Sequence, residues 1–167
     1  MAKLIVLSGV PGSGKSYFSK LFKATLKKHV YVISSDQIRS MVCGNQKDMS
    51  EDKLVWKIFY GLAHVFAMDE NGIVILDSTN SICKYRVSVI SPFRKLFDKI
   101  DLIAFDIPTD IIRKQNKERT FPVDDDVLEM LIDRYEEPNE LDCRFFDDIH
   151  IVKDHDIMPL IESYKPE

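Results

Sequence analysis

Residues 9–16 read GVPGSGKS and fit the pattern G-x-x-x-x-G-K-[ST] at every defined position. Glycines let successive backbone N–H groups converge on phosphate oxygens without interference from a Cβ atom. In this pattern the lysine reaches the β- and γ-phosphates, and the serine hydroxyl binds Mg²⁺. The alternative is a chance glycine-rich turn, but the motif stands between an apolar run and an amphipathic helical pattern. The sequence therefore predicts that ATP phosphates and Mg²⁺ are held by Gly9, Gly12, Ser13, Gly14, Lys15 and Ser16.

Five short apolar runs rich in Ile and Val predict buried strands, because they show little of the alternation that a solvent-exposed sheet face would impose. They are Lys3–Leu7, Val30–Ile33, Ile73–Leu76, Asp101–Phe105 and Ile149–Val152. Helical patterns lie between them at Ser16–Lys28, Ser50–Met68, Lys84–Phe97, Thr109–Glu118 and Asp124–Tyr135, with Ser50 and Thr109 as candidate N-caps. This alternation predicts a single α/β domain over residues 1–167, with one parallel sheet between helices.

Length and composition are those of an ordinary globular domain, and no apolar run approaches the roughly 20 residues that a membrane span requires. The apolar run near the start is too short for a signal peptide. Three distant cysteines without a C-x-x-C pair argue against a disulfide scaffold or a zinc site, and predict reduced thiols in the cytoplasm. The four scattered histidines favour surface or structural roles over metal ligation.

The net charge of −4 hides an uneven distribution. Residues 1–123 carry 19 Lys and Arg against 12 Asp and Glu, whereas residues 124–156 carry 3 against 13. Contact with nucleic acid depends on a local basic surface more than on the sum over the chain. The basic part favours a polyanionic partner mildly, although solvated helix faces explain such blocks equally well. The acidic segment 124–156 is left without an assigned role.

Ligands of such α/β folds bind beyond the carboxyl ends of the strands, so the residues after each strand carry the functional prediction. After the second strand, Asp36 opens a helix and Arg39 follows three residues later on the same face. Beside a phosphate loop, Asp36 is predicted to accept the proton of an attacking hydroxyl, and Arg39 to hold a substrate phosphate. The alternative is that Ser35 or Asp36 only caps the helix.

After the third strand, Asp77 stands where a Walker B acid would stand, suited to outer-shell Mg²⁺ ligation or to acceptor contact. Thr79 and Asn80 follow as candidate hydrogen-bonding partners of the acceptor. An Asx-type turn that leads into the next helix is the competing interpretation.

After the fourth strand, a basic helix end and a proline-containing loop predict a phosphate-closing lid around residues 113–126. Arg119 is the candidate to place a guanidinium on the transferring phosphoryl group. A solvated basic helix accounts for Arg113, Lys114 and Lys117. The guanine-reading pattern N-K-x-D is absent, because its closest string, Asn116–Arg119, lacks the aspartate.

Taken in order, G-x-P-G-S-G-K-S, S-D-x-x-R, V-I-x-D-S-T-N, F-D-I-P and N-K-E-R-T resemble the kinase domain of phage-type polynucleotide 5′-hydroxyl kinase, from about Lys3 to Tyr135. The resemblance implies a P-loop kinase three-layer sandwich with a helical lid, and transfer of the γ-phosphate of ATP to a 5′-OH end of DNA or RNA. It implies that Asp36 is the general base, that Arg39 contacts the acceptor's 3′-phosphate and that Arg119 is the lid arginine. Asp77 through Asn80 would lie near the acceptor.

Two departures weaken the predicted affinity for a polynucleotide, because Ser35 and Gln115 stand where that family has basic residues. Three further functions therefore stay open: a kinase for a small acceptor such as a nucleoside, nucleotide or sugar, a kinase for a modified base in DNA, and a regulatory ATP-binding module without an acceptor. Asp36 and Arg39 argue against the regulatory module, which needs no acceptor base.

Overall fold

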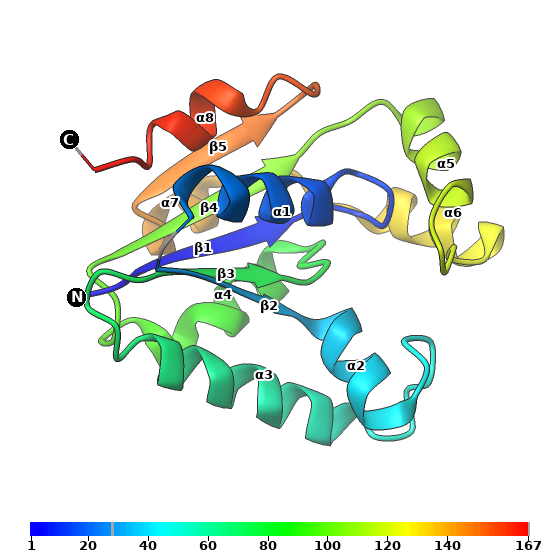
Figure 1. The fold of residues 1–167 in the computed structure, drawn as a ribbon. Helices are drawn as coiled ribbons and strands as arrows, with labels where there is room; N and C mark the ends of the chain where they lie inside the picture. Colours follow the sequence, from blue (N-terminus) through cyan, green and yellow to red (C-terminus); the bar gives the residue numbers. More distant parts are fainter. Residues whose placement is uncertain (28, 167) are drawn as a thin grey trace.

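The computed structural model describes residues 1–27 and 29–166. One sheet of five parallel strands forms its centre, in the order β2-β3-β1-β4-β5 (Figure 1). The strands are β1 (Lys3–Ser8), β2 (Val30–Ser34), β3 (Ile73–Asp77), β4 (Lys99–Phe105) and β5 (Asp148–Val152). The predicted five-stranded α/β fold is confirmed, and β4 starts two residues before the predicted Asp101 because Lys3 and Lys99 are paired in register.

Helices cover both faces of the sheet, as the apolar runs predicted. On one face lie α1 (Lys15–Leu26) and α8 (Met158–Glu162); on the other lie α3 (Asp52–Phe66), α4 (Cys83–Ile90), the short 3₁₀ helix η1 (Ser91–Phe93) and α7 (Glu140–Phe145). Successive residues of β1 supply both cores: Leu4 and Val6 pack toward α3, whereas Ile5 and Leu7 pack toward α1.

The remaining helices stand beyond the carboxyl ends of the strands (Figure 1). They are α2 (Ser35–Cys43), α5 (Thr109–Lys117) and α6 (Asp125–Arg134). Helices α5 and α6 stand where the sequence predicted a helical lid, and α2 lies opposite them across the edge of the sheet.

Several predicted boundaries were wrong, each for a local reason. The helix predicted from Ser50 starts at Asp52, because the Ser50 amide donates to Asp48 within a turn. The helix predicted to reach Phe97 ends at Ile90, where Pro92 forces a 3₁₀ turn. Thr109 is the first residue of α5 and not its cap. Lys28, the predicted end of the first helix, lies outside the described residues.

Candidate functional site: two pockets that meet at Asp36

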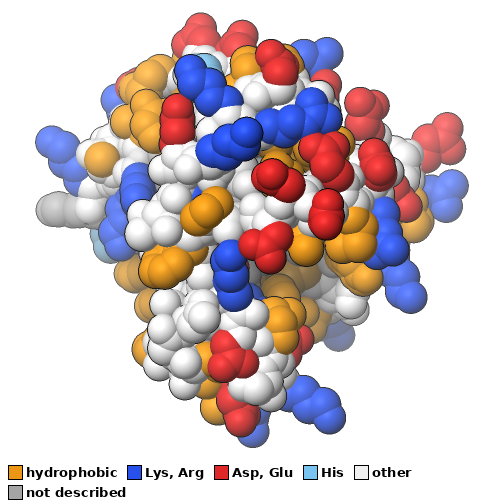
Figure 2. Space-filling view, turned by 90° about the vertical axis from the view of Figure 1, so that its right-hand side faces the viewer, with side chains coloured by type: hydrophobic (Ala, Val, Ile, Leu, Met, Phe, Trp, Pro, Cys, Tyr) orange, Lys and Arg blue, Asp and Glu red, His pale blue; other side chains and the backbone are white. Residues whose placement is uncertain are grey.

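The carboxyl edge of the sheet carries a pocket of about 560 Å³ that contains the predicted phosphate loop. Its lining comes from the loop and start of α1, the start of α2, the end of β3, and the lid. Figure 2 looks onto this edge and shows it hollowed, with basic and acidic side chains interspersed around the hollow. The charges that are separated along the sequence are therefore mixed on the folded surface.

The phosphate loop adopts a conformation that only glycine enters easily. Gly12 and Gly14 have φ angles of 87° and 98°, in the left-handed region. A Cβ atom on Gly12 would lie 2.7 Å from the carbonyl oxygen of Ile112, because the loop packs directly against α5. Gly14 is the N-cap of the 12-residue helix α1, so the positive end of that helix faces the pocket.

The Lys15 ammonium lies under the loop, where Nζ donates to the carbonyl oxygens of Gly9 at 2.7 Å and Val10 at 3.2 Å. Burial lowers the pKa of Lys15, and the nearby Asp77 carboxylate offsets part of that effect. An ammonium satisfied only by neutral carbonyls gains from an incoming anion. Lys15 is thus in place to bind phosphate oxygens.

Ser16 and Asp77 form a pair of hard oxygen donors beside the loop. The Ser16 hydroxyl donates to Asp77 Oδ2 at 3.0 Å, although the two residues are 61 positions apart. Asp77 is buried at the end of β3, and burial raises its pKa, opposed by Lys15 and by the Ser16 hydrogen bond. A buried carboxylate beside a hydroxyl is the donor set that Mg²⁺ prefers, so the residues fit the predicted ion. The hydroxyl of Ser13 is buried in the same loop with no hydrogen-bond partner in the described chain.

Asp36 stands in the first turn of α2, with half of its side chain exposed. The cap of this helix is Ser34, whose hydroxyl accepts from the Gln37 amide, so neither Ser35 nor Asp36 is used for capping as the alternative interpretation had it. One Asp36 oxygen lies 3.6 Å from Arg39 Nη1 and the other lies 3.6 Å from Arg119 Nη2. The three charged residues that the sequence singled out in separate segments are therefore neighbours.

A second pocket, of about 660 Å³, opens on the far side of Asp36. Ser35, Asp36, Ser78 and Thr79 line both pockets. Its other walls include Trp56 and Tyr60 from α3, Tyr85 from α4, and Arg39. These three aromatic residues were missed at the sequence level. The spacing of Trp56 and Tyr60 by four residues on one helix face was the available signal, but core packing explains such spacing equally well.

Arg39 lines the second pocket and already forms an ion pair with Asp52. Its side chain is 7% exposed, and Nη2 donates to Asp52 Oδ1 at 2.7 Å. Its Nε is buried and has no hydrogen-bond partner among residues 1–27 and 29–166. A phosphate bound here would add to, or replace, the Asp52 contact.

Thr79 and Asn80 differ in what they offer a ligand. Thr79 is partly exposed and lines both pockets, and its carbonyl accepts from the Gly9 amide at 2.9 Å. Asn80 is buried with a φ of 44°, and its Nδ2 donates to the Leu7 carbonyl at 2.9 Å. The amide of Asn80 therefore holds its own loop against β1, and the pocket receives only part of the residue.

The lid is held together by contacts that do not involve the Arg119 side chain. Asn116 is buried and hydrogen-bonds both backbone groups of Val123, at 2.8 and 3.0 Å, which closes the loop between α5 and α6. Arg113 pairs with Glu129 across the two helices, in keeping with its prediction as a surface residue. Arg119 lines the first pocket and makes its ion pair with Asp36, 28% exposed.

Arg86 of α4 is fully buried and was not singled out from the sequence. Its guanidinium pairs with Asp142 of α7, with Nε and Nη2 both 2.9 Å from the carboxylate. Nη1 also donates to the carbonyls of Asn80 at 3.3 Å and Glu136 at 2.8 Å. Part of the acidic segment 124–156 thus has a structural role: it ties the chain that follows the lid to the loop after β3.

Comparison with known proteins shows which family the chain belongs to. The sequence model of the family described as "Chromatin associated protein KTI12" matches residues 1–144. Protein kti12 of Schizosaccharomyces pombe (strain 972 / ATCC 24843) is 27% identical over 147 residues, which are 81% of this chain and 52% of that protein. The chain therefore spans about half the length of this relative.

Two solved structures share the fold. Chaetomium thermophilum Kti12 in complex with ADP-AlF3 has a TM-score of 0.67 at 20% identity, covering 96% of this chain and 94% of that one. A fungal RNA kinase has a TM-score of 0.66 at 19% identity, covering 100% and 91%. The predicted P-loop kinase fold is confirmed, whereas the resemblance to phage-type polynucleotide kinase stays a prediction beyond that shared fold. The chain belongs to the Kti12 family.

Proposed function

We propose that this chain is an ATP-dependent kinase that transfers the γ-phosphate to the 5′-hydroxyl end of DNA or RNA. The observation that carries the proposal is the meeting of two pockets at Asp36, one of them lined by the phosphate loop. A protein that only hydrolyses ATP needs one nucleotide pocket and a water molecule. A second pocket that opens on the same carboxylate fits an acceptor.

The donor side follows from the first pocket. The loop amides and the N-terminus of α1 bind the phosphates, and Lys15 neutralises the β- and γ-phosphates. Ser16 and Asp77 would hold Mg²⁺, which supplies charge neutralisation when bound. The ADP-AlF3 complex of the C. thermophilum Kti12 supports an adenine nucleotide as the donor.

The transfer step assigns a role to each of the charged neighbours. Asp36 accepts the acceptor's hydroxyl proton while the acceptor oxygen bonds to the γ-phosphorus, and the bond from that phosphorus to the β–γ bridging oxygen breaks to release ADP. Arg119, now 3.6 Å from Asp36, would move to the transferring phosphoryl group, whose negative charge competes for the guanidinium. Since the transition state is loose, the placement of the hydroxyl contributes as much as its deprotonation.

The acceptor side is supported by the second pocket. Trp56, Tyr60 and Tyr85 offer flat faces for a base, and each stacked base contributes about 1–3 kcal/mol. Arg39 supplies a positive charge for a phosphate, and Thr79 supplies a hydroxyl between the pockets.

One observation favours a second candidate, a kinase for a small acceptor such as a nucleoside or sugar. Arg39 is already neutralised by Asp52, so the second pocket has no unpaired cation for a polyanion in the described chain. The loss of basic residues at Ser35 and Gln115 points the same way.

The test is a transfer assay with γ-labelled ATP, Mg²⁺ and a panel of acceptors: 5′-OH DNA and RNA oligomers, nucleoside 3′-monophosphates, free nucleosides and sugars. We expect label on the 5′ ends of oligomers and none on matched oligomers that carry a 5′-phosphate. Label on nucleosides or sugars alone would replace the proposal with the small-acceptor kinase. Release of free phosphate with every acceptor would favour the regulatory module.

A further inference from the structure

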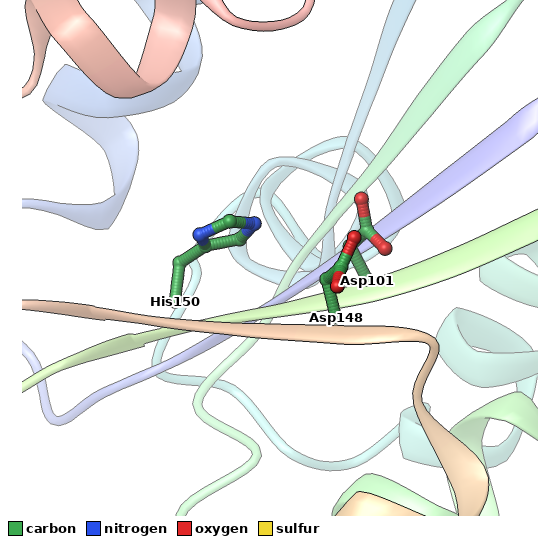
Figure 3. Close-up of side chains that lie close together, drawn as sticks. All are labelled: Asp101, Asp148 and His150. Atoms are coloured by element: carbon green, nitrogen blue, oxygen red, sulfur yellow. The ribbon is translucent and has the colours of Figure 1, made fainter.

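A second cluster of ionisable side chains lies at the amino-terminal part of β4 and β5, away from both pockets. In the parallel register Asp101 faces Asp148, and Ile103 faces His150, so all three ionisable side chains project from one face of the sheet. Figure 3 shows the two carboxylates and the imidazole gathered above the two strands. One atom from each residue lies within 4.8 Å of one from each of the others.

The two oxygens of the Asp101 carboxylate differ, because one accepts a hydrogen bond and the other does not. Its side chain is 2% exposed. Oδ2 accepts from the Tyr164 hydroxyl at 2.8 Å, while Oδ1 is buried with no hydrogen-bond partner in the described parts of the chain. An unsatisfied buried carboxylate oxygen is costly unless it contacts a proton donor or a cation.

Lys99 is a nearby cation, but its ammonium pairs with carboxylate oxygens other than Oδ1 of Asp101. Its Nζ pairs with Oδ2 of Asp148 at 2.5 Å and with Oδ2 of Asp101 at 3.3 Å. Two carboxylates and one ammonium leave a formal charge of −1, and Oδ1 of Asp101 remains unpaired. The Lys99 side chain is 38% exposed, so it can turn toward solvent if a second cation enters.

We propose that Asp101, Asp148 and His150 bind a divalent transition-metal ion, with Zn²⁺ as the best match. Two carboxylate oxygens and one imidazole nitrogen form a mixed set of the kind that Zn²⁺ accepts, and the exposed Asp148 leaves room for water at a fourth position. Tyr164 takes the role of an outer-shell donor, because it fixes one oxygen of Asp101 and leaves the other for the ion.

The position of the cluster indicates what bound metal would do. It joins β4 to the edge strand β5, and through Tyr164 to α8, the helix that covers this side of the sheet. A bound ion would stabilise the C-terminal edge of the fold without touching the phosphate loop. The site is independent of the proposed kinase activity, and it gives His150 a ligand role in place of the surface or structural role expected from the sequence.

The test is calorimetric titration with Zn²⁺ alongside thermal unfolding, in the presence of excess Mg²⁺ to occupy hard oxygen sites elsewhere. For the wild type we expect one ion per chain, and a rise in Tm of about 5–10 °C when free Zn²⁺ is one hundred times its dissociation constant. His150→Gln and Asp148→Asn should lose this rise. His64→Gln, in the exposed part of α3, is the matched control and should keep it.

Tyr164→Phe sharpens the assignment, because it keeps the ring and removes only the hydroxyl. We expect it to weaken Zn²⁺ binding about 10- to 100-fold. Unchanged Zn²⁺ affinity in His150→Gln, or no saturable binding in the wild type, would overturn the proposal. His150 is half-buried on an edge strand, so its variant is expected to fold, which its unfolding curve without metal verifies.

Discussion

The two pockets that meet at Asp36 are built in different ways. The phosphate pocket contains the loop Gly9–Ser16, eight consecutive residues whose backbone supplies the predicted phosphate-binding groups, while α2, β3 and the lid complete its walls. The second pocket takes Arg39, Trp56, Tyr85 and Leu131 from four helices far apart in the sequence, and its chemistry lies in side chains. The phosphate loop is specified locally, whereas the second pocket exists only when the whole fold brings its walls together.

The different construction of the two pockets suggests which part of the site varies less readily between related proteins and which part varies more readily. Backbone amides in a glycine loop bind the phosphates of a nucleoside triphosphate whatever its base. The first pocket therefore sets the class of phosphate donor. Side chains from separate helices can change one at a time, so under the proposed function the second pocket would define the acceptor. Variants on either side of Asp36 should therefore affect donor and acceptor kinetics separately.

The largest effect is expected at the residue that both pockets share. Asp36→Asn should slow transfer by up to about 10⁴-fold, because the amide cannot accept the proton, while ATP affinity changes little. Single-turnover transfer and equilibrium nucleotide binding measure the two quantities. Asp110→Asn, an exposed acid in the first turn of α5, is the control and should behave as wild type. Normal turnover by Asp36→Asn would remove the general-base assignment.

Next is the buried pair of Arg86 and Asp142. Asp142→Asn should lower the free energy of unfolding by about 3–5 kcal/mol at neutral pH, because it leaves Arg86 buried without a counter-charge. Burial raises the pKa of Asp142, but hydrogen bonds from Arg86 and from the Asn139 amide outweigh it, so the pKa is lowered in the folded protein.

A lowered carboxyl pKa gives stability that is present above the unfolded value of about 4 and is lost as the pH falls through the folded value. The gap in stability between wild type and Asp142→Asn should therefore narrow in acid. Denaturant unfolding across pH measures it, with Glu137→Gln as a matched control whose side chain is exposed. If the difference in unfolding free energy between wild type and Asp142→Asn stays constant with pH, the pair stabilises the fold through packing and not through charge.

Arg119 should come third. Arg119→Ala should reduce the transfer rate by about 10²- to 10³-fold, with a smaller loss of ATP affinity, because the guanidinium is needed most when the phosphoryl group moves. The neighbouring Lys117, exposed in α5, serves as the control through Lys117→Ala. Equal losses in rate and in ATP affinity would mean that Arg119 binds the ground state only.

The smallest effect is expected at the aromatic wall. Trp56→Ala should raise the KM for an oligonucleotide roughly tenfold and leave the KM for ATP unchanged, since one stacking contact is lost. Trp56→Phe should recover most of the loss. If ATP and acceptor KM values rise together, the two pockets are not separable in the way proposed.

The features that could be predicted from the sequence are those with local signals. The five strands and the glycine loop were predictable because apolar runs and a contiguous motif are local signals. The shared placement of Asp36, Arg39, Asp77 and Arg119 was predictable, because each follows a recognisable strand or helix and the parallel sheet brings the ends of its strands to one edge. Their roles stay predictions. The contact between Arg119 and Asp36 confirms that they are neighbours.

What escaped prediction depends on long-range packing. Nothing in the sequence near Arg86 indicates that Asp142, 56 residues later, will be buried beside it. The cap of α3 is Glu51 and not the predicted Ser50, because several Ser, Asp and Glu residues cluster at its start and local pattern does not rank them. The cap of α2 is Ser34, which the sequence reading did not consider. The pairing of Asp101 with Asp148 requires the strand order, which only the folded sheet supplies.

The central claim is that Asp36 stands between a donor and an acceptor, and the partition of labelled γ-phosphate tests it most directly. Wild-type protein is incubated with labelled ATP, Mg²⁺ and an excess of 5′-OH oligonucleotide, and the label is divided into oligonucleotide and free phosphate. We predict that most of the label reaches the 5′ end, and that Asp36→Asn loses this transfer while it still binds ATP. Label found only in free phosphate, in equal amounts with and without acceptor, would contradict the account.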